Sequence, residues 1–515
     1  MLTSHMFCFQ CQETAHGTGC TAGGVCGKPA VCANIMDQLI RQLKSIAIAH
    51  EPNRKLGRFV IQSLFMTVTN VNFDKKSLLR QLKTAEKLTP PTETVIPLGV
   101  LSEADANIRS LRELLICGIK GIAAYAEHAA VLGKEDMEIY SFIFKALRAT
   151  ATDHSMEHLV ALVMECGSVA EKSMALLDAA NTAEFGIPHR TQIRIDTGSR
   201  PGILVSGHDL KDLHELLTQT LDADIDIYTH GEMLPAHCYP GLRKYPHLYG
   251  NYGNAWHQQK SEFDTFNGPI LMTSNCIIPP ADSYRKRLFT TGVCGFPGVT
   301  HISAGKPGHP KDFSALIDIA RQSPPPTPLE HGKITGGFAH GQLADLTDQL
   351  LAAVNAGIIR RFIVMAGCDG RFASRKYYTA LAQHLPEDTI ILTAGCAKYR
   401  YNKLPWGEIH GIPRVLDAGQ CNDCYSLLVF ARKLKHTLAL DDINKLPISF
   451  DVAWYEQKAV TVLLALLAAG FKNIRLGPTL PAFLSPAVAE MLTNSFCLQP
   501  IGEINSDIQA MMKGK

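Results

Sequence analysis

FIVMAGC, at residues 362–368, is a short apolar run that ends in a glycine and a cysteine. The pattern recurs as TIILTAGC at residues 389–396 and as VLDAGQC at residues 415–421. Short apolar runs that are rich in β-branched residues and bounded by turn residues predict buried strands. Because helical sequence separates the three runs, they predict a parallel α/β sheet.

The predicted sheet places three thiols at one edge. Ligands bind outside the carboxyl ends of parallel strands, because the loops of neighbouring strands converge there. Cys368, Cys396 and Cys421 follow those ends in this chain. Residues 451–470 predict a helix, and Glu456 and Lys458 lie near its beginning. We therefore expect Glu456 and Lys458 to join the thiols.

A second trio of runs, at residues 203–206, 225–229 and 270–274, lies upstream. These runs lead to His208, Glu232 and Cys276, each directly after a turn residue or one position beyond it. Two similar α/β units would therefore face one another across a shared cavity. Taken singly, each residue is more often a surface side chain or an inert buried thiol. Together they form one imidazole, two carboxylates and four thiols, which is too many for one zinc and too mixed for a plain iron–sulfur cubane.

Four more cysteines, Cys8, Cys11, Cys20 and Cys26, lie in a glycine-rich amino-terminal loop. Four thiolates in one compact loop suit an iron–sulfur cubane or a structural zinc. The spacing favours the cubane and leaves zinc open. Cys32 follows at the start of a helical pattern, where a small buried residue is expected.

The composition excludes several classes of protein. A chain of 515 residues with 46% hydrophobic and 19% charged residues is long enough for two to four domains. A net charge of +2 creates no field that favours nucleic acid or membranes, so neither is an expected partner. The longest apolar run, residues 459–469, is too short to span a membrane, and no charged leader opens the chain. We therefore expect a cytoplasmic protein, in which 15 cysteines indicate metal or redox chemistry.

The domain organisation follows from the periodicity. A helical period from about residue 34 to 181 predicts an all-α region that carries the cysteine loop. A proline-rich stretch at residues 324–328 is the clearest linker. We predict three domains, at residues 1–187, 188–323 and 324–515: a helical bundle and two α/β domains with parallel sheets.

Two cofactor motifs are not supported. The chain has no P-loop and no dinucleotide fingerprint with glycines in register, so direct use of ATP or NADH is not indicated. Cys424 forms a CxxC with Cys421, which could suggest a thioredoxin-like dithiol. We favour Cys421 as a ligand, with Cys424 turned inward along the following helix.

Four motifs resemble the hybrid-cluster proteins, also called hydroxylamine reductases. They are MFCFQCQET at residues 6–14, ICGIKG with AAYA at residues 116–126, SGHDL at residues 206–210 and YEQK at residues 455–458. The resemblance covers essentially the whole chain, although residues 1–5 precede the methionine with which family members usually begin. It implies a helical amino-terminal domain and two Rossmann-like domains, distantly similar to nickel carbon monoxide dehydrogenases.

The resemblance also implies two iron–sulfur centres. Cys8, Cys11, Cys20 and Cys26 match the ligands of an electron-transfer cluster, in the tight spacing of members with a [4Fe-4S] centre. The family's hybrid [4Fe-2S-2O] cluster is held by positions that match His208, Glu232, Cys276, Cys368, Cys396, Cys421 and Glu456. The position of Cys368 carries a persulfide in the family, and Lys458 matches a lysine beside the cluster.

The implied activity is reduction of hydroxylamine to ammonia and water with two electrons and two protons. Our hypothesis is that hydroxylamine binds iron near Glu232 or Glu456. Lys458 and Glu456 would supply protons, because a buried ammonium beside a carboxylate is poised to donate. Electrons would enter through the Cys8 cluster from an external donor protein. Nitric oxide is a second candidate substrate.

Two alternatives remain, one from a different class of protein and one that is another enzyme. A nitrosative-stress sensor that relays a nitroso group to partner proteins would bind nitric oxide tightly and reduce hydroxylamine slowly. A carbon monoxide dehydrogenase would require nickel.

Overall fold

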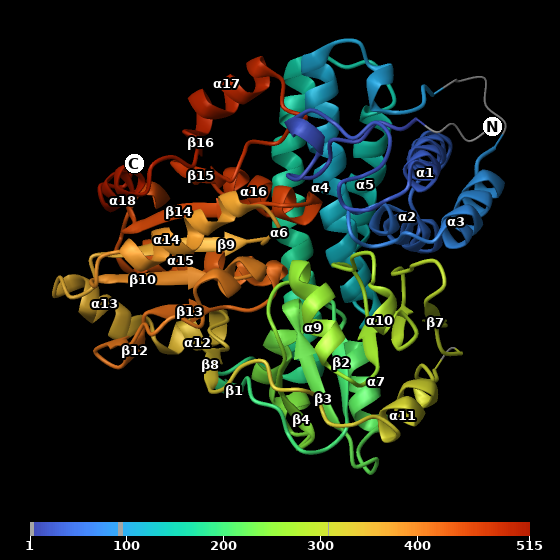
Figure 1. The fold of residues 1–515 in the computed structure, drawn as a ribbon. Helices are drawn as coiled ribbons and strands as arrows, with labels where there is room; N and C mark the ends of the chain where they lie inside the picture. The colour runs from blue at the N-terminus through green and yellow to red at the C-terminus, as the bar shows by residue number, and fades with distance from the viewer. Residues whose placement is uncertain (1–4, 91–95, 307) are drawn as a thin grey trace.

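The computed structural model describes residues 5–90, 96–306 and 308–515. The amino-terminal helices, in blue and teal, lie beside two sheets that are drawn in green and in orange to red (Figure 1). Of residues 1–5, which precede the usual first methionine of the family, residues 1–4 lie outside the described part of the chain. Residues 91–95 lie outside it as well.

Six long helices follow the cysteine loop: α1 (Ala30–Ala49), α2 (Arg54–Met66), α3 (Lys75–Leu88), α4 (Ala106–Val131), α5 (Met137–Ala149) and α6 (Met156–Phe185). Five of them begin where a side chain accepts a hydrogen bond from the first-turn backbone, as preferred N-cap residues do. These caps are Asn53, Asp74, Asp105, Asp136 and Ser155. The predicted helical region is therefore present.

Helix α4 is the centre of this region and packs against α2, α5 and α6. By length and composition alone it is the one described helix that could cross a membrane. Of its most apolar stretch, 94% is buried inside the protein. Such burial is what the central helix of a folded core shows.

The first large sheet is parallel throughout, in the order β4 (Leu248–Asn251), β3 (Asp226–His230), β2 (Gly202–Ser206), β5 (Ile270–Met272), β6 (Leu288–Thr291) and β7 (Thr300–Ile302). Helices α7 (Leu210–Gln219), α8 (Pro240–Arg243), α9 (Gln259–Thr265), α10 (Asp282–Arg285) and α11 (Ser314–Arg321) connect or flank the strands. The three upstream runs form β2, β3 and β5, which are neighbours in this sheet, with β2 between the other two.

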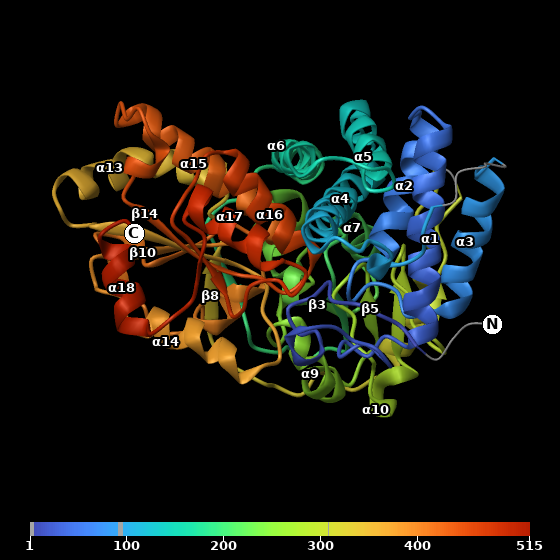
Figure 2. The ribbon, with the colours of Figure 1, turned by 90° about the horizontal axis from the view of Figure 1, so that it is seen from above.

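The second large sheet is also parallel, in the order β13 (Val415–Asp417), β10 (Thr389–Thr393), β9 (Arg361–Gly367), β14 (Ile448–Ala453), β15 (Ile474–Gly477) and β16 (Gln499–Pro500). Helices α15 (Cys424–Thr437) and α16 (Gln457–Ala468) cover one face, and α14 (Lys376–His384) and α18 (Ile504–Met512) cover the other (Figure 2). Three more helices, α12 (His340–Asp345), α13 (Thr347–Asn355) and α17 (Pro486–Phe496), complete this part.

The predicted helix at residues 451–470 is wrong at its beginning. Asp451 lies in strand β14, and the helix begins only at Gln457. All six residues of β14 are buried, because β9 and β15 flank the strand in the sheet interior. The sequence hides this strand because Asp451 interrupts its apolar run. In the fold, the Tyr377 hydroxyl donates a hydrogen bond to Asp451 Oδ2 over 2.7 Å.

A small antiparallel sheet joins the two α/β regions. Strand β1 (Thr191–Arg194) pairs with β8 (Lys333–Gly336), which comes after the proline-rich linker. The linker itself packs on the first region, where Tyr252 Oη donates to the carbonyl of Thr327 over 2.9 Å. A second small pair, β11 (Glu408–Ile409) with β12 (Ile412–Pro413), forms a hairpin. Parallel α/β sheets beside a helical region are thus confirmed, and the domain boundaries stay predictions.

Candidate metal centres

One buried cavity lies between the carboxyl ends of the two large sheets. Its volume is about 20 Å³, and all eight predicted central residues line it: His208, Glu232, Cys276, Cys368, Cys396, Cys421, Glu456 and Lys458. Tyr455, Trp256 and Asn70 are among the other residues of its wall. The fold therefore brings together side chains as far apart in the chain as His208 and Lys458, which are separated by 250 residues.

Glycine before the cysteines is required by the close approach of the strand ends. Gly367 has a φ of 110°, and a Cβ there would lie 2.0 Å from the carbonyl oxygen of Ala453. Gly395 has a φ of 88°, and its Cβ would lie 2.4 Å from the carbonyl oxygen of Gly367. Only glycine combines this left-handed backbone with so little space. The glycine that recurs before the thiols is thus part of what lets three loops crowd around one cavity.

Cys276 is the exception, because it adopts a positive φ of 75° without being a glycine. Such a conformation costs free energy, and it persists where the surroundings enforce it, often at functional sites. The carbonyl of Cys276 accepts from Gln259 Nε2 over 2.6 Å, and the next amide, of Ile277, donates to Asn70 over 3.0 Å. These bonds hold the loop at the cavity.

His208 and Glu232 carry the lone pairs that a metal would use. His208 Nε2 lies 3.5 Å from Glu232 Oε2 and 3.6 Å from Cys421 Sγ. The ligand atoms of these three residues all lie within 4.8 Å of one another. His208 Nδ1 and Glu232 Oε1 are buried without a hydrogen-bond partner. Because buried polar atoms are rarely left unpaired, this observation fits a bound metal group.

The charge states suit metal binding. Burial and the neighbouring Lys458 ammonium lower the pKa of His208 to about 3, so its imidazole is neutral. Burial opposes ionisation of Glu232, but His208, Lys398 and Lys458 outweigh it and lower the pKa of Glu232 to about 2. A neutral imidazole and an ionised carboxylate are the forms that bind metals.

The buried thiols ionise only where a positive charge nearby offsets the free-energy cost of burying a thiolate. Burial raises the pKa of Cys421 to about 12 and also raises the pKa values of Cys276, Cys368 and Cys396. Burial opposes the charge on Lys458 as well, but the surrounding thiols and carboxylates raise its pKa, so the ammonium persists. One buried cation therefore faces a set of groups that become anionic when they bind metal.

Helix α16 fixes Glu456 and Lys458 at the cavity. Glu456 is the N-cap of the helix, and its Oε2 accepts from the amide of Lys458 over 2.8 Å. Lys458 Nζ lies 3.0 Å from His208 Nε2 and 3.7 Å from Glu456 Oε1. Burial raises the pKa of Glu456, against the lowering effect of Lys458. The predicted position of both residues near the beginning of a helix is confirmed.

Several supporting residues were not predicted from the sequence. Gln420 Nε2 donates to the carbonyls of both His208 (3.1 Å) and Glu232 (2.8 Å), and so ties the third cysteine loop to the first sheet. Tyr125 Oη donates to Cys421 Sγ over 3.7 Å from helix α4. The only signal for Gln420 in the sequence is its position, one extra residue between Gly419 and Cys421.

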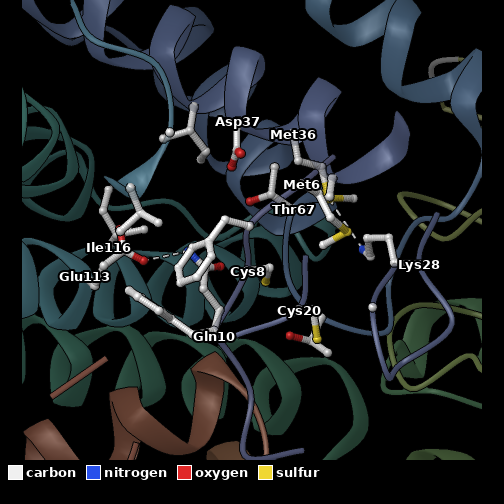
Figure 3. Close-up of a pocket in the computed structure, with 18 of the residues that line it drawn as sticks. Met6, Cys8, Gln10, Cys20, Lys28, Met36, Asp37, Thr67, Glu113 and Ile116 are labelled. Carbon is white, nitrogen blue, oxygen red and sulfur yellow. Dashed lines mark hydrogen bonds between the residues drawn. The ribbon is translucent and has the colours of Figure 1, made fainter. Parts of the chain in front are cut away.

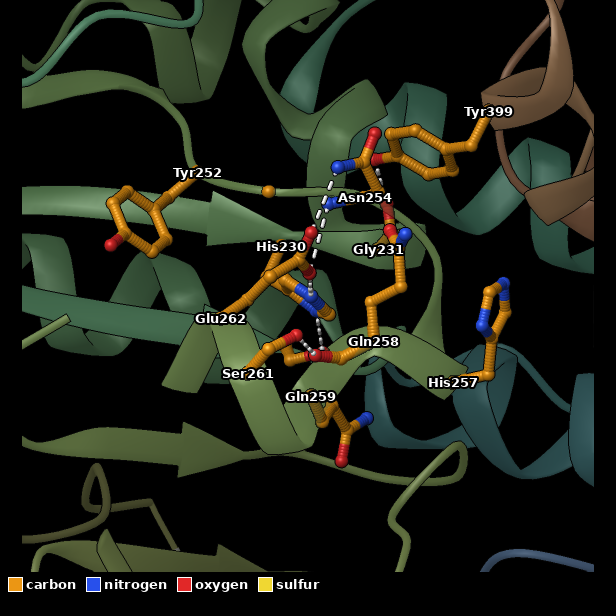
Figure 4. Close-up of polar contacts among 12 residues, drawn as sticks. His230, Gly231, Tyr252, Asn254, His257, Gln258, Gln259, Ser261, Glu262 and Tyr399 are labelled. Carbon is orange, nitrogen blue, oxygen red and sulfur yellow. Dashed lines mark hydrogen bonds and ion pairs between the residues drawn. The ribbon is translucent and has the colours of Figure 1, made fainter. Parts of the chain in front are cut away.

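The turn that carries Glu232 has its own support (Figure 4). His230 lies 3.0 Å from Ser206 Oγ through Nδ1 and 2.9 Å from Glu262 Oε2 through Nε2. Tyr399, which follows Cys396 in the second sheet's loop, donates from Oη to the carbonyl of Gly231 over 2.8 Å. This hydrogen bond connects the loop that carries Cys396 to the turn that carries Glu232, across the cavity.

The amino-terminal cysteines line a separate cavity of about 110 Å³ (Figure 3). Cys8 and Cys20 exchange two backbone hydrogen bonds, at 3.0 and 2.8 Å, which folds the loop back on itself. A tetrahedral zinc with bonds of about 2.3 Å needs its sulfur atoms about 3.8 Å apart. Among the described residues, the only group of three or more His, Cys, Asp or Glu side chains whose ligand atoms all lie within 4.8 Å of one another is His208, Glu232 and Cys421, at the central cavity.

The two sites are physically joined. The amide of Gln12, next to Cys11, donates to the carbonyl of Tyr455 over 2.9 Å. Arg375 donates to Gln12 Oε1 over 2.9 Å and to the carbonyl of Cys368 over 3.1 Å. A short series of hydrogen bonds therefore connects the cysteine loop with the wall of the central cavity.

Comparison with known proteins identifies the family of the chain. Residues 6–509 match the model of the Prismane/CO dehydrogenase family. Proteins named hydroxylamine reductase from Halothermothrix orenii and Nitratidesulfovibrio vulgaris are each 54% identical to this chain, with 99% of the chain and 100% of each relative aligned. Among solved structures, carbon monoxide dehydrogenase IV from Carboxydothermus hydrogenoformans is similar with a TM-score of 0.59 at 16% identity, covering 98% of this chain and 92% of that one. A Ni-free carbon monoxide dehydrogenase from Thermococcus sp. AM4 gives the same TM-score at 15% identity, covering 98% and 91%.

The two solved structures show a shared fold. The resemblance seen in the sequence motifs is confirmed by the family match and by the closer relatives, which align over almost their whole length. On this evidence the chain belongs to the Prismane/CO dehydrogenase family.

Proposed function

We propose that the protein is an iron–sulfur oxidoreductase that reduces hydroxylamine to ammonia and water. The observation that carries the proposal is the convergence of all eight predicted residues on one buried cavity, in a chain 54% identical to proteins named hydroxylamine reductase. The reaction consumes two electrons and two protons. An external donor protein would supply the electrons.

The donor set suits a hybrid [4Fe-2S-2O] cluster, held by His208, Glu232, Cys276, Cys368, Cys396, Cys421 and Glu456. Soft thiolates match the sulfide part of such a group, and the imidazole and carboxylates match its oxygen-bridged part. The two unpaired buried atoms of His208 and Glu232 support this assignment. We assign a persulfide to Cys368 and a [4Fe-4S] cluster to Cys8, Cys11, Cys20 and Cys26.

When bound, the hybrid cluster would supply redox-active iron with a position for a small compound that contains nitrogen and oxygen. The chain's own residues handle the protons. Lys458 holds a proton at Nζ inside the cavity, and Glu456 lies 3.7 Å from it at Oε1. Cleavage of a bond between nitrogen and oxygen requires a proton on the departing oxygen, so these two groups are placed to deliver it. Burial of the cavity excludes bulk water from competing protonation.

The path for electrons would run from the amino-terminal loop through the contact between Gln12 and Tyr455. Nitric oxide is a second substrate that presents nitrogen bonded to oxygen. We further propose that residues 1–187, 188–323 and 324–515 are a helical domain and two Rossmann-like domains, since each large sheet is formed within one of the last two ranges. Fifteen unpaired cysteines suit a cytoplasmic, reducing location.

The test is an analysis of anaerobically prepared protein for iron, zinc, nickel and sulfide, with EPR, followed by assays with hydroxylamine and nitric oxide. We expect iron and sulfide in amounts that fit two clusters, and formation of ammonia from hydroxylamine. Zinc or nickel in place of iron, or iron without ammonia formation, would contradict the proposal. Slow hydroxylamine turnover with tight nitric oxide binding and a stable partner protein would instead indicate a sensor.

A further inference from the structure

We propose that a polar route carries protons from a solvent-facing hollow in the helical region to the wall of the central cavity, and that Glu113 passes them into it. The proposal rests on the proposed function, because reduction of hydroxylamine to ammonia and water consumes two protons in each turnover. Lys458 and Glu456 hold protons at the inner end. They must regain protons after each turnover, in a cavity from which bulk water is excluded.

The outer end of the route is a hollow of about 470 Å³ beside the beginning of helix α4 and the end of α5. Its wall includes Ser102, Thr152 and Asp153, which are exposed, and Glu113, which is buried. A polar hollow of this size holds water, since each water molecule finds the two to four polar partners that it needs. The buried carboxyl of Glu113 therefore meets solvent on one side.

Glu113 lies where this hollow meets the cavity of the amino-terminal cysteines. Lys44, Gly99 and Glu113 line both spaces. Glu113 and Cys20 lie at different sides of the cysteine cavity, and a hydrogen bond joins Glu113 to Gln10 between them (Figure 3). A cluster bound by the thiols would therefore leave the side of Glu113 open to the hollow.

Three hydrogen bonds lead inward from this carboxyl. Gln10 Nε2 donates to Glu113 Oε2 over 2.9 Å, and Gln457 Nε2 donates to Gln10 Oε1 over 3.1 Å. Thr69 Oγ1 in turn donates to Gln457 Oε1 over 3.1 Å. Thr69 lines the central cavity, and Gln457 directly precedes Lys458 in helix α16. The series thus joins the solvent-facing hollow to the wall of the central cavity.

The partners of Gln10 fix the direction of its amide. Its Oε1 also accepts from Lys120 Nζ over 2.8 Å, so its Nε2 must face an acceptor, which Glu113 provides. Gln10 lies between Cys8 and Cys11 in the sequence. The route for protons therefore passes beside the site through which electrons would enter.

The inner end of the route offers an unpaired hydrogen-bond donor. Asn70 follows Thr69 and lines the central cavity. Its Oδ1 accepts from Tyr455 Oη over 3.4 Å, whereas its Nδ2 is buried without a hydrogen-bond partner among the described residues. Since buried polar atoms are rarely left unpaired, a water molecule fits beside this amide.

The carboxyl of Glu113 and water molecules carry the protons, because a side-chain amide has no readily ionised proton and serves to orient water. Glu113 gives a proton inward and regains one from the hollow, so its charge is restored in each turnover. Two groups that interact with Glu113 also titrate near neutral pH. Burial raises the pKa of Asp37 to about 7 and lowers the pKa of Lys44 to about 8. Groups with such pKa values exchange protons efficiently at neutral pH.

The first experiment locates ordered water in a high-resolution X-ray structure of the cluster-loaded protein. We expect water molecules bonded to Glu113 in the hollow and to Nδ2 of Asn70 in the central cavity. A structure in which either position is dry would overturn the route. This result does not depend on whether the protein is active.

The second experiment uses Glu113→Gln, which keeps an acceptor for Gln10 but has no proton to give. Protein that is reduced beforehand should form ammonia from hydroxylamine about tenfold more slowly in a single turnover, with a larger solvent deuterium isotope effect than the wild type. Reduction of the amino-terminal cluster without substrate should keep its rate in stopped-flow measurements, because that step needs no proton at the central cavity.

Glu127→Gln is the matched control. Glu127 is also a buried carboxyl of α4, but its Oε1 accepts from Gln62 Nε2 over 2.9 Å, outside the route. This variant should keep both the wild-type rate and the wild-type isotope effect. If Glu113→Gln does not fold, Thr69→Val removes the hydroxyl at the inner end with little change of shape, and the same slowing and isotope effect are expected.

Slower turnover of Glu113→Gln without a larger isotope effect, or equal slowing of cluster reduction, would mean that Glu113 has a structural role, and the proposal would fail. An unchanged single-turnover rate would also overturn the role of Glu113 and would leave the proposed function intact. Ordered water along the route in a wild-type protein that forms no ammonia would instead retain the route and overturn the proposed function.

Discussion

The cysteine loop and the central cavity are built in opposite ways. The loop takes four thiols from residues 8–26, and its shape depends on local backbone hydrogen bonds such as those between Cys8 and Cys20. The cavity takes its side chains from six strand ends and a helix start, and residues 250 positions apart lie 3.0 Å from each other. A local site can form wherever the loop is held, whereas the central site exists only when both sheets are folded and docked. This difference suits a cysteine loop that receives electrons and a central cavity in which the substrate is reduced.

The largest expected effect comes from removing one thiol from each region, in two separate variants. Cys11→Ala should remove the amino-terminal cluster and reduce turnover with a protein electron donor by about a thousandfold or more, because electrons lose their entry point. Cys396→Ala should abolish turnover with any donor. EPR should still show the central centre in Cys11→Ala and the amino-terminal centre in Cys396→Ala.

Loss of both EPR signals in either variant would mean that the regions are not independent. Cys117→Ala provides the control for a buried thiol, because Cys117 lies in α4 outside both sites.

A smaller effect is expected from the proton donor of the central region. Lys458→Ala should lower kcat, counted per protein molecule that holds its iron, by about a hundredfold, the usual contribution of general acid catalysis. Lys458→Arg keeps the charge but holds its proton too tightly to donate, so it should retain the EPR signal without full activity. Full turnover of Lys458→Ala at full iron content would refute the assignment.

The buried carboxyl of Asp451 should make the stability of the protein depend on pH. Burial raises the pKa of Asp451, in strand β14 of the second sheet, from 3.8 to about 7. The folded protein therefore holds this proton more tightly than the unfolded chain, and stability falls as the pH rises from about 4 to about 7. The change corresponds to as much as about 4 kcal/mol. Asp451→Asn should raise the thermal midpoint at pH 8 more than at pH 6.

Glu13 in the cysteine loop is the counterpart. It is fully buried, and Arg371 donates to its Oε2 from Nε over 2.8 Å. Glu13→Gln should lower stability by about 1–3 kcal/mol, because a charged hydrogen bond is lost. Equal pH dependence of Asp451→Asn and the wild type would contradict the account of Asp451.

An effect of similar, small size is expected for the glycines. Gly395→Ala should destabilise the protein by about 1–3 kcal/mol and lower the iron content of the central site, since the backbone is left-handed and the Cβ meets the carbonyl of Gly367. Gly407→Ala is the matched control: Gly407 has a φ of 67° but no atom within 4 Å of the added Cβ. Thermal unfolding and iron analysis of the two variants separate strain from crowding.

Sequence patterns predicted most of the strands and the residues that follow their carboxyl ends, but few of the contacts between one strand or loop and another. The repeated glycine and cysteine located β9, β10 and β13, because a buried strand and a tight turn are local properties. Strand β14 was missed, since Asp451 breaks its apolar run and only the fold supplies Tyr377 as partner.

The supports of the central site are long-range contacts and leave no local signature. Tyr399 reaches Gly231 across 168 residues, and Gln420 reaches Glu232 across 188. A family resemblance could nominate the ligands, but only the fold brings their side chains to one place.

Anomalous diffraction at the iron absorption edge, on crystals of anaerobically prepared protein, tests the central claim most directly. We predict two separate groups of iron atoms, one within the loop of Cys8 to Cys26 and one bound between His208 and Cys421. Iron in the loop alone, or zinc between His208 and Cys421, would contradict the account.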